Sequence, residues 1–139
     1  MTRLPLTVRA GIAAGIAVVT FGAANAVGQI QIAQASADPE LFAALMDEGA
    51  EGFDDNCSIC HGDNGEGGGG GPRLAGNDYV SSNTALVSQI IFGYEDHGMP
   101  PFDHLSDREI AAIATFVRNS WGNEYGITPL AVVAQNREE

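Results

Sequence analysis

Apolar residues recur at helical spacing along three stretches of the chain, and no stretch alternates with the period of a strand. The first stretch follows Asp38-Pro39, a pair typical of a helix N-terminus, with Asp as N-cap and Pro in the first turn. We predict a helix from there to about Cys57. Its apolar face carries, at i, i+4, i+7 and i+11, Phe42, Met46, Gly49 and Phe53.

Two further helices follow from the same periodicity. Ser81, Ser82 and Asn83 lead into the second, which Gly93 and the turn at residues 98–101 end. Its apolar positions are Leu86, Val87, Ile90, Ile91 and Tyr94. The third begins at the capping box of Ser106 and Glu109 and stops at Gly122. Its stripe comprises Ile110, Ile113, Ala114, Val117 and Trp121. A Thr-Pro pair at residues 128–129 predicts a short terminal helix.

The N-terminal segment has the order of a secretory signal: two Arg, an apolar run at residues 10–24, and small residues at a cleavage site. We expect residues 1–26 to be a signal peptide, with cleavage after residue 37 as the alternative, and residues 27–38 to be a flexible leader. An uncleaved membrane anchor is the competing interpretation, although the run is short and weakly hydrophobic for a bilayer span. Export predicts a periplasmic location, and membrane contact only if the segment stays uncleaved.

The net charge of the chain restricts the partners that it can be expected to bind. The chain has six Arg, no Lys and 18 acidic residues, a formal net charge of −12. Removal of residues 1–26 takes away two Arg and leaves −14. Nucleic acid is therefore excluded as an expected partner. With 139 residues, there is room for one small domain, and domains of this size often complete their core with a metal or cofactor.

Cys57-Ser-Ile-Cys60-His61 is the strongest chemical signal in the chain. Two thiols at this spacing can add to the two vinyl groups of a haem, and the histidine that follows directly can bind its iron. Three other kinds of site could also use two cysteines at this spacing. A redox thiol pair requires a βαβ context, a zinc site requires more Cys or His ligands, and a disulfide explains neither His61 nor the rest. The sequence therefore predicts covalent haem c.

A second axial ligand has four candidate donors, namely Met46, His97, Met99 and His104. Met99 lies in a Gly-Met-Pro-Pro turn 38 residues after His61, where prolines stiffen the backbone and no helix stripe accounts for a methionine. Met46 belongs to an apolar stripe, and the two histidines lie in a polar loop. We therefore favour Met99, since a thioether suits a low-spin electron carrier.

Several motifs together resemble the class I monohaem cytochromes c. They are Cys57–Gly62, the glycine-rich loop at residues 62–76 that ends in Gly71-Pro72-Arg73-Leu74-Ala75-Gly76-Asn77, Gly98–Phe102, Leu105–Asp107 and Arg118–Asn123. The resemblance covers about residues 39–123 and includes bacterial cytochrome subunits that serve periplasmic dehydrogenases. It implies an all-α fold, a small cytochrome c domain of three main helices and loops wrapped around one covalent haem, followed by a C-terminal extension at residues 124–139.

The resemblance also implies roles for individual residues. The first and last helices would cross through Gly49, Phe53 and Phe116. The Pro72 carbonyl would accept a hydrogen bond from the free nitrogen of His61, and Arg73 would pair with a haem propionate. Unlike the basic members of the family, this chain has no lysine with which to meet an acidic partner.

These observations predict a one-electron carrier that is not an enzyme and binds no small-molecule substrate. Its partners would be redox proteins: a periplasmic dehydrogenase, an oxidase or a membrane cytochrome complex. One alternative is a dedicated electron-accepting subunit of a dehydrogenase complex, and another is a haem sensor or peroxidase-like enzyme with an open sixth position. A dense acidic face would guide docking or merely favour solubility. It comprises Asp47, Glu48, Glu51, Asp54, Asp55, Asp63 and Glu66.

Overall fold

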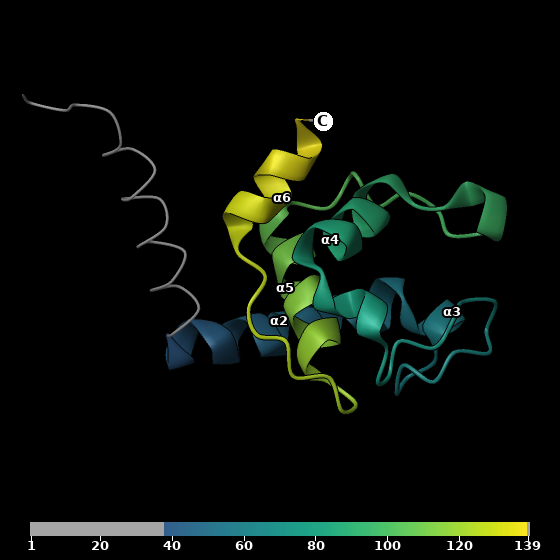
Figure 1. Ribbon diagram of the computed structural model, residues 1–139, viewed down its shortest axis with the longest axis horizontal. Coiled ribbons are helices and arrows are strands. Elements are labelled where there is room, and N and C mark those ends of the chain that lie inside the picture. Colours follow the sequence, from purple (N-terminus) through teal and green to yellow (C-terminus); the bar gives the residue numbers. More distant parts are fainter. Residues whose placement is uncertain (1–37, 139) are drawn as a thin grey trace, which may run out of the picture.

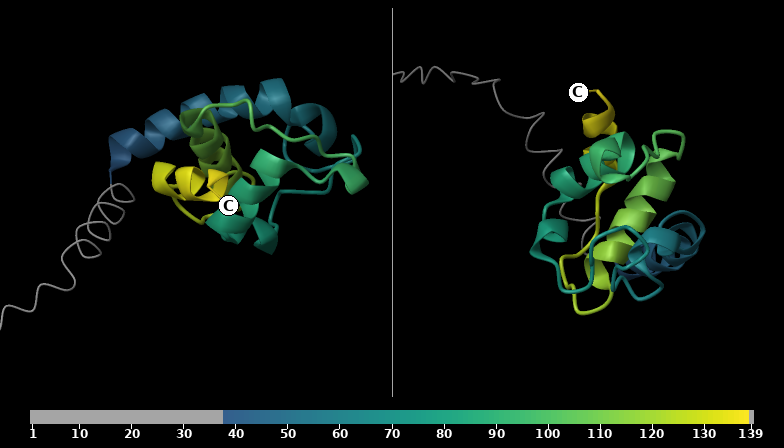
Figure 2. Two further views of the ribbon diagram at one scale, coloured as in Figure 1. Left: turned by 90° about the horizontal axis from the view of Figure 1, so that it is seen from above. Right: turned by 90° about the vertical axis from the view of Figure 1, so that its right-hand side faces the viewer.

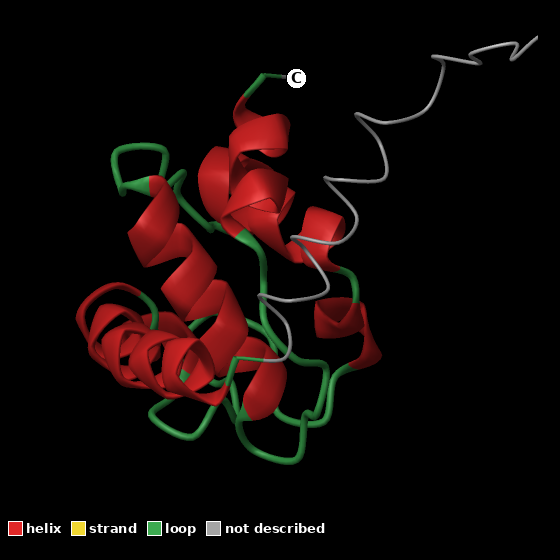
Figure 3. Ribbon diagram, turned by 90° about the vertical axis from the view of Figure 1, so that its left-hand side faces the viewer, coloured by secondary structure: helices red, strands yellow, loops and turns green. Residues whose placement is uncertain are grey.

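The computed structural model describes residues 38–138, so the predicted signal peptide and residues 27–37 of the leader lie outside the described residues. Within this part the chain is helix and loop, as predicted (Figure 3). The described α-helices are α2 (Pro39–Asn56), α3 (Ser58–His61), α4 (Asn83–Phe92), α5 (Asp107–Asn119) and α6 (Leu130–Arg137). Two 3-10 turns, η1 (Asp78–Ser81) and η2 (Glu95–His97), lie before and after α4. None of the described helices is long and apolar enough to cross a membrane.

The helices begin where the capping residues predict. Asp38 Oδ1 accepts hydrogen bonds from the backbone N–H groups of Glu40 and Leu41 at 3.0 and 3.1 Å, which satisfies two donors in the first turn of α2. The capping box of α5 is complete, because Ser106 N donates to Glu109 Oε2 at 2.7 Å and Glu109 N donates to Ser106 Oγ at 3.3 Å. Local hydrogen bonding therefore confirms these predicted starts.

Some of the predicted stripe positions differ from the buried ones. In α2 the buried side chains are Leu45 and Phe53, whereas Met46 is only half-buried. Tyr94 and Trp121 are not helical at all: Tyr94 follows the end of α4 and is exposed, and Trp121 lies two residues beyond α5. The predictions failed here because helical spacing continues through residues that the tertiary fold bends out of the helix. Trp121 has a φ of 54°, a left-handed conformation that no helix contains.

The most extensive contact between the described helices is the crossing of α2 and α5. Figure 1 shows α2 crossing behind the lower part of α5, which stands in the middle of the molecule. A Cβ atom at Gly49 would lie 2.1 Å from the Ala112 carbonyl oxygen, so only glycine permits this approach of the two backbones. Phe53 lies beside the crossing, with its ring centroid 5.6 Å from that of Phe116 and 5.0 Å from that of Trp121. The crossing that the resemblance implies is therefore present, between α2 and α5, the helix that carries Phe116.

The chain after α5 belongs to the same core. Helix α6 packs against α4 and α5, and its Val133 is fully buried in the main apolar cluster. Ile127 and Thr128 are also buried, so the predicted C-terminal extension at residues 124–139 contributes both apolar and polar contacts. Figure 2 shows α4, α5 and α6 gathered on one side of α2, while α3 stands at the far end of α2. The end of the molecule at α3 carries the cysteines.

Candidate cofactor site

The two cysteines lie at the junction of α2 and α3. Cys57 caps the C-terminus of α2, and Cys60 lies in the single turn of α3. Both thiols are free and half-buried. Burial raises the pKa of the Cys57 thiol to about 12, with a smaller contribution from Cys60. The Cys57 sulfur is therefore a neutral thiol at physiological pH.

His61 ends α3 and is buried, with 8% of its surface exposed. Its Nδ1 lies 2.8 Å from the carbonyl oxygen of Pro72. A carbonyl only accepts, so Nδ1 carries the proton and donates it, and the other ring nitrogen, Nε2, holds the lone pair that can bind a metal. This is the contact between His61 and Pro72 that the family resemblance implies. It fixes both the tautomer and the orientation of the imidazole.

The glycine-rich loop folds back over α3 and places Pro72 there. The backbone N–H groups of Gly69 and Gly71 both donate to the Cys60 carbonyl, at 3.1 and 3.0 Å. A Cβ atom at Gly69 would lie 2.0 Å from the Ile59 carbonyl oxygen, and one at Gly71 would lie 2.8 Å from the His61 ring. Side chains at these two positions would push the loop away from the histidine, which explains why both are glycine.

Two polar residues at the ends of the Arg118–Asn123 motif, to which the sequence assigned no role of their own, hold the loops around this site. Asn123 Nδ2 donates to the Leu74 and Val117 carbonyls at 3.0 and 2.8 Å, which joins the glycine-rich loop to α5. Arg118 is 4% exposed, and burial lowers its pKa. Its guanidinium donates to backbone carbonyls of η1 and of the segment after α5, namely those of Val80, Ser81, Tyr125 and Gly126. Only long-range contacts reveal these roles.

Met99 lies in the loop between η2 and α5. Its backbone pairs with that of Tyr94, through bonds of 3.2 Å from Met99 N and 2.8 Å from Tyr94 N. Its half-buried thioether accepts a hydrogen bond from Gln89 Nε2 on α4 at 3.6 Å. Figures 1 and 2 both place η2 at the same end of the molecule as α3. Gln89 was not predicted, since one polar residue among the apolar positions of α4 is no signal by itself.

The other candidate ligands, and the arginine expected to pair with a propionate, have different surroundings. His97 and His104 are exposed, and His97 stacks on Tyr94 with the ring centroids 4.0 Å apart. Arg73 is exposed, and its Nε donates to the carbonyl oxygen of Ala75 at 2.8 Å. Met46 stays on α2, half-buried. Of the residues predicted to touch the cofactor, the structure thus brings Cys57, Cys60, His61 and Pro72 directly together.

The site fits a haem better than the alternatives. A redox-active thiol pair has a lowered thiol pKa, whereas that of Cys57 is raised, and the described residues contain no βαβ unit. No group of three His, Cys, Asp or Glu side chains among residues 38–138 is arranged to hold a metal ion, which argues against zinc. Two free thiols beside an imidazole of fixed tautomer match what covalent haem attachment requires.

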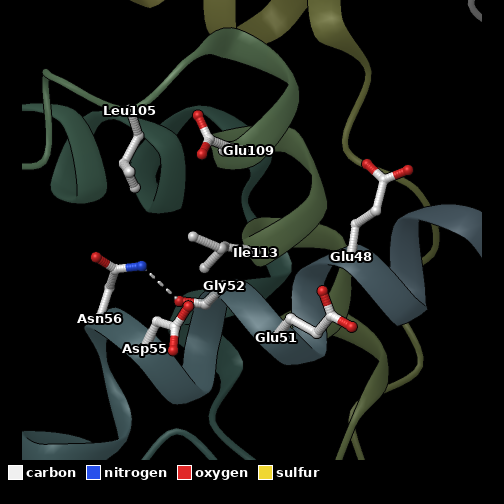
Figure 4. Close-up of a pocket in the computed structure, with 8 residues that line it drawn as sticks. All are labelled: Glu48, Glu51, Gly52, Asp55, Asn56, Leu105, Glu109 and Ile113. Carbon is white, nitrogen blue, oxygen red and sulfur yellow. Dashed lines mark hydrogen bonds between the residues drawn. The ribbon is translucent and has the colours of Figure 1, made fainter.

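A separate acidic groove lies on the outer side of the helix crossing (Figure 4). Its volume is about 260 Å³. Gly52 and Ile113 form its apolar floor, and the carboxylates of Glu51 and Asp55 on α2 face Glu109 on α5 across it (Figure 4). Glu48, at one end, forms a bidentate ion pair with Arg108 at 2.8 and 2.9 Å, which lowers the pKa of the Glu48 carboxyl. The groove does not include the cysteines.

Comparison with known proteins gives a consistent result. The chain is 39% identical over 88 residues to the cytochrome c subunit of a quinone-dependent alcohol dehydrogenase from Gluconobacter oxydans, a match that covers 54% of this chain and 18% of that protein. It is 33% identical over 104 residues to the cbb3-type cytochrome c oxidase subunit FixP from Azorhizobium caulinodans, a match that covers 68% of this chain and 36% of that protein. The chain thus spans well under half of the length of these relatives.

The family model that matches covers residues 44–117, from the middle of α2 to the last turn of α5. This range contains the cysteines, His61, Pro72 and Met99, and it exceeds half of the chain. The helical fold and the free thiols beside the oriented histidine agree with it. The chain therefore belongs to the cytochrome c family described as cytochrome c oxidase, cbb3-type, subunit III, whose members hold a covalently bound haem c.

Proposed function

We propose that this protein is a one-electron carrier that holds one haem c through Cys57 and Cys60, with His61 and Met99 as axial ligands. One observation carries the proposal: His61 is buried directly after the second cysteine, and its Nδ1 is 2.8 Å from the Pro72 carbonyl. A histidine held in this way presents Nε2 to a metal in one orientation. The hydrogen bond also raises the basicity of the imidazole, which strengthens its bond to iron.

The chain's own residues hold and shield the group. The haem supplies the redox chemistry, because its iron takes up and releases one electron. Cys57 and Cys60 would tether the ring at the end of α2, and the glycine-rich loop orients His61. Arg73, which now donates to a loop carbonyl, would turn to a propionate and neutralise it. With both thiols bonded to the ring and the imidazole of His61 bound to the iron, neither cysteine nor His61 would be free to act as a nucleophile or a general base, which supports a carrier with no reaction or small-molecule substrate of its own.

Met99 is the proposed sixth ligand because its surroundings suit a thioether on iron. Pro100 and Pro101 restrict the backbone next to it, and Gln89 donates a hydrogen bond to its sulfur. A donor to the sulfur draws electron density from it and thereby favours the ferrous state. The exposed histidines lack such support, and Met46 is held within a helix.

Spectra of the haem-loaded Met99→Ala variant test the axial ligands. Wild-type ferric protein should show the red-region sulfur-to-iron absorption band, and the variant should lose it and acquire a lower reduction potential. His97→Ala and His104→Ala serve as matched controls and should retain both. If the band survives in Met99→Ala, Met99 is not the ligand and Met46→Ala is the next variant to test. Tight binding of carbon monoxide by the reduced wild type would instead favour a sensor or peroxidase with an open sixth position.

A second function is supported by the relatives. Their names describe subunits of a dehydrogenase and of an oxidase, so this chain would serve as the dedicated electron-accepting subunit of such a complex. Purification of the tagged chain from its own cells, in mild detergent and at low salt, separates the two functions. A stoichiometric larger enzyme in the eluate favours the subunit, and a chain that elutes alone yet exchanges electrons rapidly favours the free carrier.

The N-terminal segment supports a periplasmic location. The basic start, the short apolar run and the small residues that follow are the features of a cleaved signal, expected to end after residue 26 or, alternatively, after residue 37. Haem attachment to a Cys-x-x-Cys-His sequence requires both thiols in the reduced state. The mass of the mature protein from a periplasmic extract distinguishes the two cleavage sites from an uncleaved anchor.

The acidic face favours a basic redox partner. Its seven carboxylates on α2 and the following loop are exposed, and within residues 38–138 only Glu48 among them has an arginine partner. A partner with Lys or Arg around its electron port would be steered to this face, and its rate of electron transfer should fall as salt rises. Asp54→Asn with Asp55→Asn should lower the slope of that dependence. A rate that is flat or rises with salt would mean that docking is apolar and that the carboxylates serve solubility.

A further inference from the structure

We propose that Arg137, in the C-terminal helix α6, is a positioning residue for Met99. It holds the Met99 loop, defined as residues 99–106, in the conformation that presents the thioether. The proposal rests on the proposed function, because Arg137 acts on the haem site only if Met99 is the axial ligand. The family match ends at residue 117, so α6 and its arginine lie outside the part of the chain that the family describes.

The contacts of Arg137 converge on the C-terminal half of the Met99 loop. Its Nη1 donates to the Asp103 carbonyl at 2.9 Å, and its Nη2 donates to the Leu105 carbonyl. Its Nε donates to Asp107 Oδ1 at 2.6 Å, in the first turn of α5. One planar guanidinium thus bridges the loop and the helix that follows it. A guanidinium holds such a set of acceptors more rigidly than separate donors would.

The Met99 loop has few other restraints. Pro100 and Pro101 have no N–H to donate. The loop's backbone hydrogen bonds are those of Met99 with Tyr94, of Phe102 N with the Ile90 carbonyl at 3.0 Å, of Leu105 N with the Phe102 carbonyl at 3.1 Å, and those of Ser106, which caps α5. The first two hold the start and middle of the loop against α4 and the turn that follows it, and Ser106 holds its end to α5. Between them, Arg137 restrains the carbonyls of Asp103 and Leu105.

Helix α6 is a firm base for this contact. Val133 is fully buried, and α6 packs on both α4 and α5. Figure 1 shows the chain after η2 running back past α4 to the start of α5, next to α6. The guanidinium itself is partly shielded, with 28% of the Arg137 side chain exposed. Its hydrogen bonds therefore compete less with water than those of an arginine in free solution.

The functional consequence concerns ligand exchange. A thioether is a weak ligand, so it stays on the iron only if the loop rarely moves away. In Arg137→Gln the loop loses the guanidinium that binds the Asp103 and Leu105 carbonyls. We therefore expect imidazole, added as an external ligand, to displace Met99 with about tenfold higher affinity than in wild type. That factor corresponds to the loss of roughly one charge-assisted hydrogen bond. Hydrogen exchange at the Phe102 and Leu105 amides should accelerate by a similar factor.

Three control variants separate positioning from general stability. Arg108→Gln removes an exposed arginine of α5, which pairs with Glu48 and not with the Met99 loop, and it should match wild type in both measurements. Gly49→Ala destabilises the α2–α5 crossing and should leave the imidazole affinity unchanged. Arg137→Lys keeps a positive charge for Asp107 but lacks the planar guanidinium that binds both carbonyls at once, so it should behave like Arg137→Gln.

The outcomes are distinct. Weaker or unchanged imidazole binding in Arg137→Gln, or an equal gain in Arg108→Gln, would overturn the positioning role. Wild-type behaviour of Arg137→Lys would overturn the assignment to the two carbonyl contacts. If Met99→Ala retains its sulfur-to-iron band, the proposed ligation fails, and the role of Arg137 toward Met99 fails with it. Hydrogen exchange of the Met99 loop then still reports whether Arg137 holds the loop, because that measurement does not depend on the identity of the ligand.

Discussion

Replacement of Gly49 by alanine tests the contact on which the fold depends most. Gly49 lies on α2 where that helix crosses α5, and a Cβ there would lie 2.1 Å from the Ala112 carbonyl oxygen and 2.7 Å from the Phe116 Cβ. Backbone atoms cannot rotate away as a flexible side chain can. The two helices would have to separate, and the aromatic cluster of Phe53, Phe116 and Trp121 would have to repack around them.

The magnitude follows from the distance. A carbon atom normally approaches a carbonyl oxygen to about 3.3 Å, so relief of a 2.1 Å contact requires a shift of about 1.2 Å. Overpacking of this kind typically costs about 1–3 kcal/mol and occasionally more. The higher helix propensity of alanine offsets roughly 1 kcal/mol of this loss of stability. Since the obstacle is backbone, we place the overpacking at or above the top of that range and expect a net loss of about 2 kcal/mol, or roughly 8–16 °C in Tm.

Unfolding of the haem-loaded protein in guanidinium chloride measures this loss, with Trp121 fluorescence and far-ultraviolet circular dichroism as two probes. Ala43→Gly, at an exposed position of α2, calibrates the helix-propensity term in the same helix. Gly52→Ala is the matched control. Its Cβ would meet the Ile113 side chain at 2.8 Å, and that side chain can change rotamer, so its net effect should be within about 1 kcal/mol of zero.

Equal or greater stability of Gly49→Ala than of wild type would refute this reasoning. The crossing would then have room that the structure excludes, and the close approach of α2 and α5 would not explain the glycine. A change in the slope of unfolding with denaturant would instead mean that the compactness of the denatured or native state has changed or that unfolding is no longer two-state, and coincidence of the fluorescence and circular dichroism transitions distinguishes these cases.

Three further predictions concern single side chains. Cys60→Ala should abolish most haem-loaded protein, because a core this small requires its cofactor and one thioether is lost; haem content per chain measures it, and folded, colourless protein at normal yield would contradict it. Arg118→Leu should lower the free energy of unfolding by about 3 kcal/mol or more, since the buried carbonyls lose their donor, and a loss below about 1 kcal/mol by denaturant titration would disprove that role. Hydrogen bonds from the Ser106 side chain and backbone lower the pKa of Glu109, so the stability they add is present above the unfolded pKa of about 4.3 and is lost as pH falls through the lower folded pKa. Ser106→Ala should therefore weaken the dependence of stability on pH below about 4.3, and an unaltered dependence in unfolding measured across that range would show that the capping box does not contribute.

Residues that interact within a few positions of each other could be predicted from the sequence. Asp38 caps α2, Ser106 and Glu109 close the capping box of α5, and Gly93 ends α4, each through hydrogen bonds or backbone preferences that span at most four residues. The haem attachment sequence is equally local, because both thiols and the histidine must meet one ring. Its spacing was enough to predict the cofactor, whereas the all-α class was predicted from the helical periodicity and the family resemblance.

The tertiary structure decided what depends on residues far apart in the chain. It made Arg118 a buried donor to carbonyls 37 and 38 residues away, and it joined Arg137 to the Met99 loop. It also turned Trp121 out of the helical pattern at a φ of 54°, where the ring packs against Gly65 of the glycine-rich loop. An arginine that will be buried and one that will be solvated have the same local sequence signature. The difference arises only when distant backbone carbonyls converge on the guanidinium, because the energy of a buried polar group depends on which partners surround it.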